Sequence, residues 1–331
     1  MRQKIVVLGS NSFSGAHMVD HALMQGLEVA GISRSSEPSS EFLPYSNNPE
    51  LGSGFQFHAI DIRLETARLI DFLDAFKPDY VINFAAQGMV AESWLHPEQW
   101  FETNLVAAVK LHEYLRGCDY LKRFVQISTP EVYGNCHGQV DEGHPYNPST
   151  PYAVSKAACD MSLATYYRQY KFPVITTRAA NVYGPGQQLY RVIPKTILGI
   201  LKGVKLPLHG GGSSVRSFIH IRDVVDATLK LAYEGISGSV YHLATDRYVS
   251  IRQLIEMICD SMNVSFEQQV EIVGDRAGKD SAYLLNTNRM KDELNWSPSI
   301  TLEQGIQETI EWVKGNFDSL SGLPVKYVHQ A

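Results

Sequence analysis

In the first half of the chain, short runs of β-branched and other apolar residues alternate with longer segments of helical periodicity. The apolar runs are Lys4–Leu8, Glu28–Ser33, Phe55–Ala59, Tyr80–Phe84 and Phe124–Ser128. Such short, nearly continuous apolar runs are typical of parallel strands that are buried on both faces. Parallel neighbours are joined by crossovers, which are usually helical and right-handed. The alternation therefore predicts an α/β fold with a Rossmann-type, doubly wound parallel sheet.

Two helices are expected in the middle of the chain, over Glu98–Leu115 and Tyr152–Tyr170, and a strand over Val174–Arg178 follows the second. From Asn181 onward the pattern loosens, and Pro, Gly and Tyr gather in loops. We therefore expect residues 1–180 to form the main domain. Residues 181–331 are expected to form a smaller α/β domain, with some of its strands returning to the main sheet.

The smaller domain contains two clear helix starts. Ser250 with Gln253, and Thr301 with Gln304, have the spacing of capping boxes. In a capping box, the hydroxyl and the amide each satisfy a backbone N–H at the start of the helix. The boxes predict helices over Ile251–Met262 and Leu302–Asn316.

Charge and cysteine spacing exclude several classes of function. The net charge of -6 argues against a broad surface for nucleic acid or anionic membrane. No apolar run reaches the roughly 18 residues that suggest a membrane-spanning helix, and the N-terminal MRQKIVVLG lacks the layout of a signal peptide. The four cysteines are scattered without CxxC spacing, so neither a metal site nor a disulfide framework is expected. We expect a cytoplasmic protein.

A glycine-rich segment, Gly9-Ser-Asn-Ser-Phe-Ser-Gly15, joins the first strand to a helix. A turn of this kind lets the backbone approach a pyrophosphate, and the helix N-terminus supplies N–H groups and a favourable dipole. Ser12 stands where a middle glycine is usual, so the motif is imperfect. The segment predicts a dinucleotide site formed by Gly9, Ser12, Phe13 and Gly15.

The end of the second strand bears on the choice of cofactor. NAD enzymes usually carry an acidic residue there for the ribose 2′-hydroxyl, whereas this chain has Ser33 and Arg34. These side chains favour a 2′-phosphate, and therefore NADP, with NAD as the alternative; Arg34 can also be an ordinary solvated loop residue. Asp61 and Ile62 are placed to meet the adenine, and Phe84, Ala85 and Ala86 to line the dinucleotide.

Tyr152 and Lys156 lie at the start of the helix that follows the strand ending at Ser128. Their i, i+4 spacing places both side chains on one face. A nearby ammonium favours the phenolate, so we expect a lowered pKa for Tyr152. Such a tyrosine can exchange a proton with a substrate hydroxyl while a nicotinamide exchanges hydride with the same carbon.

Taken together, these motifs resemble the extended short-chain dehydrogenase/reductase family. The resemblance rests on the Gly9–Gly15 loop, Asp61-Ile62, Phe84-Ala85-Ala86, Asn104, Ser128-Thr129, Tyr152 with Lys156, and Asn181-Val-Tyr-Gly-Pro185. The later stretches Arg216–His220, Asp275-Arg276 and Leu294–Pro298 resemble nucleotide-sugar 4,6-dehydratases. The resemblance implies that Asn104 and Lys156 contribute to the cofactor site and that Thr129 bonds the sugar beside Tyr152.

Glu131, in Ser128-Thr-Pro-Glu-Val-Tyr-Gly134, separates the possible reactions. Sugar epimerases of the family usually have a small or hydroxyl residue there. A dehydratase needs a base for the C5 proton and an acid for the C6 hydroxyl. The dTDP-glucose 4,6-dehydratases carry Asp-Glu at this point, whereas Pro130 replaces the aspartate here. GDP-mannose 4,6-dehydratases also lack the aspartate, so the resemblance implies that Glu131 performs both roles.

The resemblance also implies a nucleotide-diphosphate sugar as substrate. Asn181, Arg216 and Arg276 match positions that hold the nucleotide, and guanidinium groups suit phosphate oxygens. Arg191 opens a helix that is expected to cover the nucleotide, and each arginine taken alone can also be a solvated surface charge. The family is commonly dimeric through a bundle of the two middle helices, so a homodimer is expected.

Three hypotheses remain open. The first is a 4,6-dehydratase that produces a 4-keto-6-deoxy sugar through transient hydride transfer. The second is a C4 epimerase or a decarboxylase, and Glu131 disfavours the epimerase. The third is a non-catalytic sensor of the dinucleotide, although sensors typically lose the Tyr/Lys pair that this chain retains.

Overall fold

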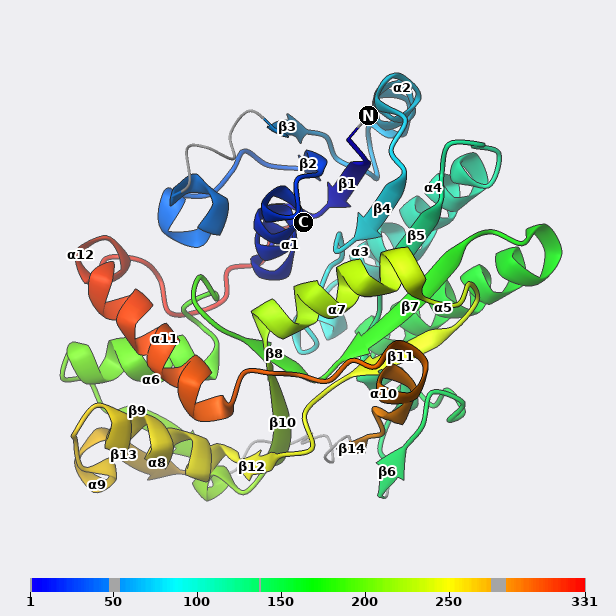
Figure 1. The fold of residues 1–331 in the computed structure, drawn as a ribbon. Helices are drawn as coiled ribbons and strands as arrows, with labels where there is room; N and C mark the ends of the chain where they lie inside the picture. Colours follow the sequence, from blue (N-terminus) through cyan, green and yellow to red (C-terminus); the bar gives the residue numbers. More distant parts are fainter. Residues whose placement is uncertain (1, 48–53, 137, 275–283, 331) are drawn as a thin grey trace.

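The computed structural model describes residues 2–47, 54–136, 138–274 and 284–330. Its main feature is a parallel sheet with the order β11-β7-β5-β4-β1-β2-β3 (Figure 1). The strands are β1 (Lys4–Leu8), β2 (Glu28–Ser33), β3 (Phe55–Ala59), β4 (Tyr80–Asn83), β5 (Arg123–Ile127), β7 (Val174–Ala179) and β11 (Val240–Leu243). The strand order reverses between β1 and β4, and ligands bind at the carboxyl ends of strands beside such a switch point. The doubly wound fold is confirmed.

Helices cover both faces of this sheet. One face packs against α1 (Phe13–Met24) and α7 (Ile221–Glu234), and the other against α2 (Thr66–Phe76), α4 (Ala108–Leu115) and α5 (Pro151–Tyr170). Successive side chains of β1 alternate between the two cores: Ile5 and Val7 enter the first, and Val6 and Leu8 enter the second. The apolar run of β1 is therefore continuous because both of its faces are buried.

The helix expected over Glu98–Leu115 is present but irregular. It consists of α3 (Pro97–Phe101), a π-helical stretch over Glu102–Ala107 and then α4. Hydrophobic periodicity does not separate an α-turn from a π-turn, so the sequence did not predict this stretch. The other expected strands and helices agree with the structure to within one residue at each end, and both capping boxes are present.

The smaller unit lies below the carboxyl edge of the sheet in Figure 1. Its strands are β8 (Asn181–Tyr183), β9 (Leu206–His209), β10 (Val215–His220), β12 (Tyr248–Ser250) and β13 (Val270–Val273). Its helices are α6 (Val192–Leu201), α8 (Ile251–Ser261), α9 (Phe266–Gln269), α11 (Leu302–Gly315) and α12 (Phe317–Leu320). They enclose a separate core that includes Ile197, Leu254 and Ile306.

Two parts of the chain beyond residue 180 return to the main unit. Strand β11 pairs with β7, and α7 packs on α1. Further pieces, β6 (Gln139–Val140), β14 (Leu284–Leu285) and α10 (Asn288–Leu294), lie near this edge of the sheet. Residues beyond position 180 therefore also contribute a strand to the central sheet.

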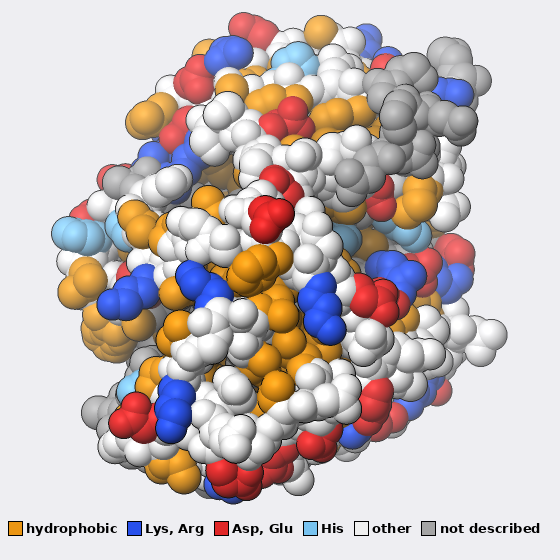
Figure 2. Space-filling model, turned by 90° about the vertical axis from the view of Figure 1, so that its left-hand side faces the viewer, with side chains coloured by type: hydrophobic (Ala, Val, Ile, Leu, Met, Phe, Trp, Pro, Cys, Tyr) orange, Lys and Arg blue, Asp and Glu red, His pale blue; other side chains and the backbone are white. Residues whose placement is uncertain are grey.

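Figure 2 shows the side of the molecule that lies at the left of Figure 1. Hydrophobic side chains gather in a patch in its lower half, with lysine and arginine side chains at the border. Acidic side chains lie below the patch, so the described residues on this face carry both signs of charge. Within the described ranges, no helix is long and apolar enough to cross a membrane.

Candidate active site

The turn after β1 packs closely against the end of β4. Gly9 has a φ of +77°, and a Cβ on it would lie 2.7 Å from the backbone nitrogen of Ala85. A Cβ on Gly15 would lie 2.1 Å from the carbonyl oxygen of Gly9. Both positions therefore require glycine. The result is a loop of bare backbone at a helix N-terminus, which fits the pyrophosphate of a dinucleotide.

Ser12, at the imperfect position of the motif, is the N-cap of α1. Its φ is -75°, and its hydroxyl accepts a hydrogen bond from the backbone N–H of Gly15 at 3.0 Å. Because this φ is negative, the backbone does not need glycine here. Phe13 is the first residue of α1 and is buried.

The end of β2 is tied to this turn. The Ser33 hydroxyl accepts from the backbone N–H of Asn11 at 3.0 Å, so it orders the turn. The Arg34 guanidinium donates to the main-chain carbonyl of Gln330 at 2.9 Å. Nothing in the sequence pattern predicted this partner, because the two residues lie at opposite ends of the chain.

The ends of β3 and β4 supply the other expected cofactor residues. Asp61 accepts hydrogen bonds from the backbone and side chain of Arg63. Burial opposes its ionisation, but these bonds outweigh burial and hold the pKa of Asp61 below its ordinary value. Ile62 is buried beside it, and Phe84, Ala85 and Ala86 follow β4 at the switch point.

Asn104, in the π-helical stretch, has its buried side chain fully engaged within the protein. It accepts from the backbone N–H of Gln87 at 2.8 Å and donates to the Gln87 carbonyl at 3.1 Å and to the Ser155 hydroxyl at 2.9 Å. Asn104 thus fixes the loop after β4 against the helix that carries Tyr152.

The four expected catalytic residues lie together beyond the end of β5. Thr129 caps a single turn, Pro130–Tyr133, by accepting from the backbone N–H of Glu131 at 3.3 Å. Pro130 is the first residue of that turn, where a missing N–H costs nothing. Tyr152, at the start of α5, hydrogen-bonds with Thr129 and lies within electrostatic reach of Glu131.

The pKa expected for Tyr152 is not borne out. Burial raises it above its ordinary value, the Glu131 carboxylate raises it further, and the bond with Thr129 only partly opposes this. The Lys156 ammonium is nearly buried and donates to the Ile127 carbonyl at 2.6 Å. Burial lowers the pKa of Lys156. The i, i+4 spacing is correct, but the lysine is directed to the strand end and its charge does not offset the burial of the phenol.

Three of the four expected substrate residues lie on the smaller unit. Asn181 begins β8, Arg191 is the exposed N-cap of α6, and Arg216 lies on β10. Arg191 is close enough to Tyr152 to act on its pKa, so it lies near the expected catalytic residues. Arg276 lies outside the described residues.

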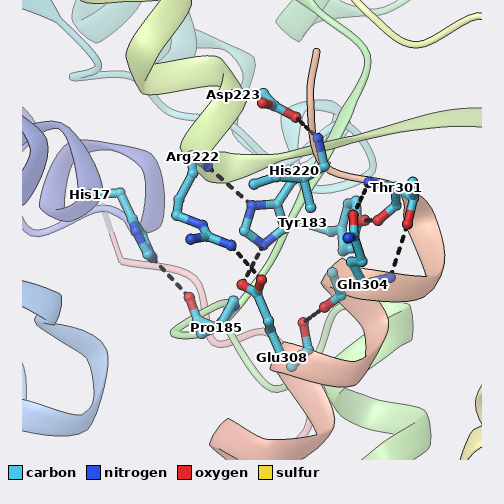
Figure 3. A network of polar contacts seen from close by, with 12 residues as sticks. His17, Tyr183, Pro185, His220, Arg222, Asp223, Thr301, Gln304 and Glu308 are labelled. Atoms are coloured by element: carbon cyan, nitrogen blue, oxygen red, sulfur yellow. Dashed lines mark hydrogen bonds and ion pairs between the residues drawn. The ribbon is translucent and has the colours of Figure 1, made fainter.

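The Asn181–Pro185 motif is held by a network that joins the two units (Figure 3). His17 of α1 bonds the Pro185 carbonyl at 2.8 Å. His220, the N-cap of α7, accepts from the backbone N–H of Arg222 at 3.3 Å and lies 3.5 Å from a Glu308 carboxylate oxygen on α11. The loop expected to contact the diphosphate is therefore anchored to both units.

A buried polar network behind the Pro130–Tyr133 turn was missed from the sequence. Asp160 of α5 pairs with Arg178 of β7 at 2.9 Å, with side chains only 2% and 1% exposed, and accepts from the Ser128 hydroxyl at 2.6 Å. Arg178 also donates to Tyr133, which bonds His242 of β11 at 2.6 Å. The only sequence signal is an arginine within an apolar strand. Within the described ranges, no cluster of His, Cys, Asp or Glu could hold a metal ion.

Comparison with known sequences gives a consistent result. The profile of the GDP-mannose 4,6-dehydratase family matches residues 6–309. A dTDP-glucose 4,6-dehydratase from Xanthomonas campestris is 30% identical, over 96% of this chain and 95% of the relative. A human dTDP-D-glucose 4,6-dehydratase is 36% identical, over 73% of this chain and 70% of its own length.

Solved structures resemble the chain over nearly its whole length. A dTDP-glucose 4,6-dehydratase from Streptomyces venezuelae with NAD bound has a TM-score of 0.86 at 29% identity, covering 96% of this chain and 98% of the other. A UDP-glucose 4-epimerase from Thermotoga maritima with UDP-glucose has the same TM-score at 26% identity, covering 95% and 100%. Backbone similarity alone therefore does not separate the two activities.

Proposed function

Because the chain belongs to the GDP-mannose 4,6-dehydratase family, we propose that it converts a nucleotide-diphosphate sugar into its 4-keto-6-deoxy derivative. The observation that carries this proposal is the grouping of Thr129, Glu131 and Tyr152 at the carboxyl edge of the sheet. A hydroxyl, a carboxylate and a phenol are the groups that proton transfer at C4 and C5 requires. Relatives named as 4,6-dehydratases support the same reaction.

A nicotinamide dinucleotide bound beside the Gly9–Gly15 turn would supply hydride chemistry, with hydride passing from C4 to the nicotinamide and back to C6, so the reaction would have no net redox change. Tyr152 takes the proton of the C4 hydroxyl, and Thr129 positions that hydroxyl through its bond with the phenol. We assign Lys156, one helical turn later, to the cofactor ribose and to the proton path from Tyr152. Its contact with the end of β5 fixes it at the sheet edge.

Glu131 carries out the elimination. The C4 ketone acidifies the C5 proton, and the Glu131 carboxylate removes it. The protonated Glu131 then gives this proton to the C6 hydroxyl, which leaves as water. Tyr152 then releases the C4-hydroxyl proton to solvent, Glu131 takes one up from solvent, and Glu131 delivers it to C5 as C6 is reduced, so the product differs from the substrate by one water. Pro130 has no group that could transfer a proton, so the turn offers one carboxylate for both steps.

The second candidate is a C4 epimerase, because a solved epimerase shares the fold with a TM-score of 0.86. Epimerisation needs no base for C5, and Glu131 would then have no role. A decarboxylase would use a sugar that carries a carboxylate and release carbon dioxide. The masses of the three products differ from those of their substrates in different ways, so a product measurement separates the reactions.

We propose NAD as the cofactor. The sequence favoured NADP because of Arg34, but that guanidinium donates to the Gln330 carbonyl. The solved dehydratase from Streptomyces venezuelae contains NAD, which supports the same choice. A direct comparison of the dissociation constants for NAD and NADP tests it.

A homodimer remains a proposal for the assembled protein. Val154 and Met161 lie seven residues apart on α5, so they share one face, and Val106 lies on the neighbouring π-helical stretch. All three side chains are exposed. Burying this face against a second copy would remove apolar area from water. Light scattering coupled to size-exclusion chromatography measures the mass, which Met161→Glu should lower.

Two further expectations stand as proposals. Residues 181–331 mainly bind the nucleotide sugar, and residues 1–180 bind the dinucleotide and carry Tyr152 and Lys156. The cytoplasm remains the proposed location, and the four cysteines, all unpaired thiols, support it. Fractionation of the source cells would test the location.

The experiment that tests the function is turnover of a panel of nucleotide sugars, with products analysed by mass spectrometry. A dehydratase gives a product lighter by one water and incorporates deuterium at C5 in heavy water. Glu131→Gln should lose both, whereas the exposed Glu271→Gln on β13 should keep both. A product of unchanged mass with inverted C4 would establish the epimerase instead, and no product from any sugar would favour a non-catalytic sensor.

A further inference from the structure

The segment 325–330 follows α12 and runs back toward α1 (Figure 1). It has no helix or strand, but its exposure alternates. Val325, Tyr327 and His329 are partly buried, and Lys326, Val328 and Gln330 are exposed. A two-residue period is that of an extended chain with one side against the protein. We call residues 325–330 the strap.

The inward side chains of the strap contact both units. Val325 packs on the core of the smaller unit. The Tyr327 ring meets Tyr190 edge-on at 5.4 Å. His329 stacks on Trp100 of α3 with ring centroids 5.2 Å apart, and its Nε2 lies 2.7 Å from the Gln99 side-chain oxygen. The strap is therefore anchored at several points along its length.

Beyond these anchors, the strap crosses the carboxyl edge of the sheet beside the Gly9–Gly15 turn. The Gln330 carbonyl accepts from the Arg34 guanidinium at 2.9 Å and from the Gln87 side-chain amide at 3.0 Å. Arg34 follows β2 and Gln87 follows β4, and these two strands lie on either side of β1. The carbonyl thus bridges the two sides of the Gly9–Gly15 turn.

We propose that the strap is part of the cofactor site, where it retains the dinucleotide and selects NAD over NADP. This inference rests on the proposed function, in which one dinucleotide must stay bound from the first step to the last. A strap that bridges the ends of β2 and β4 slows the exchange of a dinucleotide bound at the Gly9–Gly15 turn with dinucleotide in solution. It also directs an Arg34 donor to a neutral carbonyl, and a 2′-phosphate would have to displace that bond.

The test measures cofactor exchange in the full-length protein loaded with NAD. Tyr327→Ala/His329→Ala removes two anchors, and Val328→Ala alters an outward side chain, 66% exposed, as the control. Isotopically labelled NAD and, separately, NADP are added in excess, and the bound cofactor is followed by mass spectrometry. We expect the double variant to exchange NAD about tenfold faster and its preference for NAD over NADP to fall about tenfold, as the loss of a charged hydrogen bond implies. The control should match the wild type.

His329→Gln keeps a hydrogen-bonding group for Gln99 but loses the stack on Trp100. We expect a smaller rise in the NAD exchange rate and a smaller fall in the preference for NAD. This variant keeps the test decisive if the double variant folds poorly. Unchanged exchange and preference in folded variants would overturn the proposal. Tighter NAD binding by the variants would also overturn it, because the strap would then occupy the place of the dinucleotide. A wild-type protein that binds no dinucleotide or dehydrates no sugar would refute the proposed function itself.

Discussion

The buried Asp160–Arg178 pair should behave as one energetic unit. In Arg178→Met, the Asp160 carboxylate stays 2% exposed and keeps the Ser128 hydroxyl as a partner. In Asp160→Leu, the guanidinium stays buried without its counter-charge. Breaking a buried ion pair from one side costs about 3–5 kcal/mol, because the remaining charge is uncompensated. Each single change should therefore lower the free energy of unfolding by that amount.

The double change Asp160→Leu/Arg178→Met removes both charges. The Ser128 hydroxyl, which is buried, then loses its partner, and the Tyr146 hydroxyl loses the bond from Arg178 but belongs to a side chain that is 38% exposed, while Tyr133 keeps its bond with His242. An unsatisfied buried hydroxyl costs about 1–3 kcal/mol. The double variant should thus be more stable than either single variant, although the two separate losses sum to about 6–10 kcal/mol.

The assay is equilibrium unfolding in urea, followed by tryptophan fluorescence at saturating dinucleotide. The wild type, the two single variants and the double variant are compared. Where their m-values are equal, a shift in the urea midpoint reports a change in the free energy of unfolding. Ser128→Ala serves as a control, because it removes the hydroxyl alone and should cost far less than either charge. If the loss in the double variant equals the sum of the single losses, the two charges are not coupled and the reasoning is refuted.

Three further predictions follow from single residues. Tyr152→Phe should lower turnover by about 10²–10⁴-fold while dinucleotide affinity stays near that of the wild type, and steady-state kinetics beside a binding titration would check both. Gly15→Ala should weaken dinucleotide binding and stability together, because its Cβ would lie 2.1 Å from the Gly9 carbonyl oxygen; near-wild-type affinity would show that the turn can adjust. Burial lowers the pKa of His17 to about 4 from its ordinary 6.5, partly offset by the Pro185 carbonyl. Between these values the unfolded chain binds more protons, so the free energy of unfolding should fall as pH falls from 6.5 to 4, by up to about 3 kcal/mol, and His17→Gln should flatten that slope in urea titrations.

Local patterns predicted most of the framework. The strands that lead to the Gly9–Gly15 turn and to Thr129 were recognisable because both faces of each strand are buried. The capping boxes at Ser250 and Thr301 were recognisable because they depend on residues three apart. Tyr152 could be placed at the site because it follows the carboxyl end of a parallel strand, and Thr129 and Glu131 were added to it by the resemblance to nucleotide-sugar 4,6-dehydratases.

What the sequence did not predict depends on contacts between distant residues. Arg34 meets Gln330 only because the strap returns across the sheet. The pKa of Tyr152 depends on its burial and on Glu131, and the spacing between Tyr152 and Lys156 gives no information about either. In the π-helical stretch, Asn104 forms hydrogen bonds with Gln87 and Ser155, and hydrophobic periodicity does not predict these contacts.

The late arrival of β11 has a consequence for synthesis on the ribosome. The outer edge of β7 is covered by residues 240–243, which are translated well after β7 itself. At about 5–20 residues per second, the roughly 60 intervening residues leave that edge unpaired for roughly 3–12 s. An open parallel edge is a template for pairing with another chain. Nascent chains of this protein should therefore be most prone to aggregate, and to need a chaperone, in the interval before Leu243 emerges.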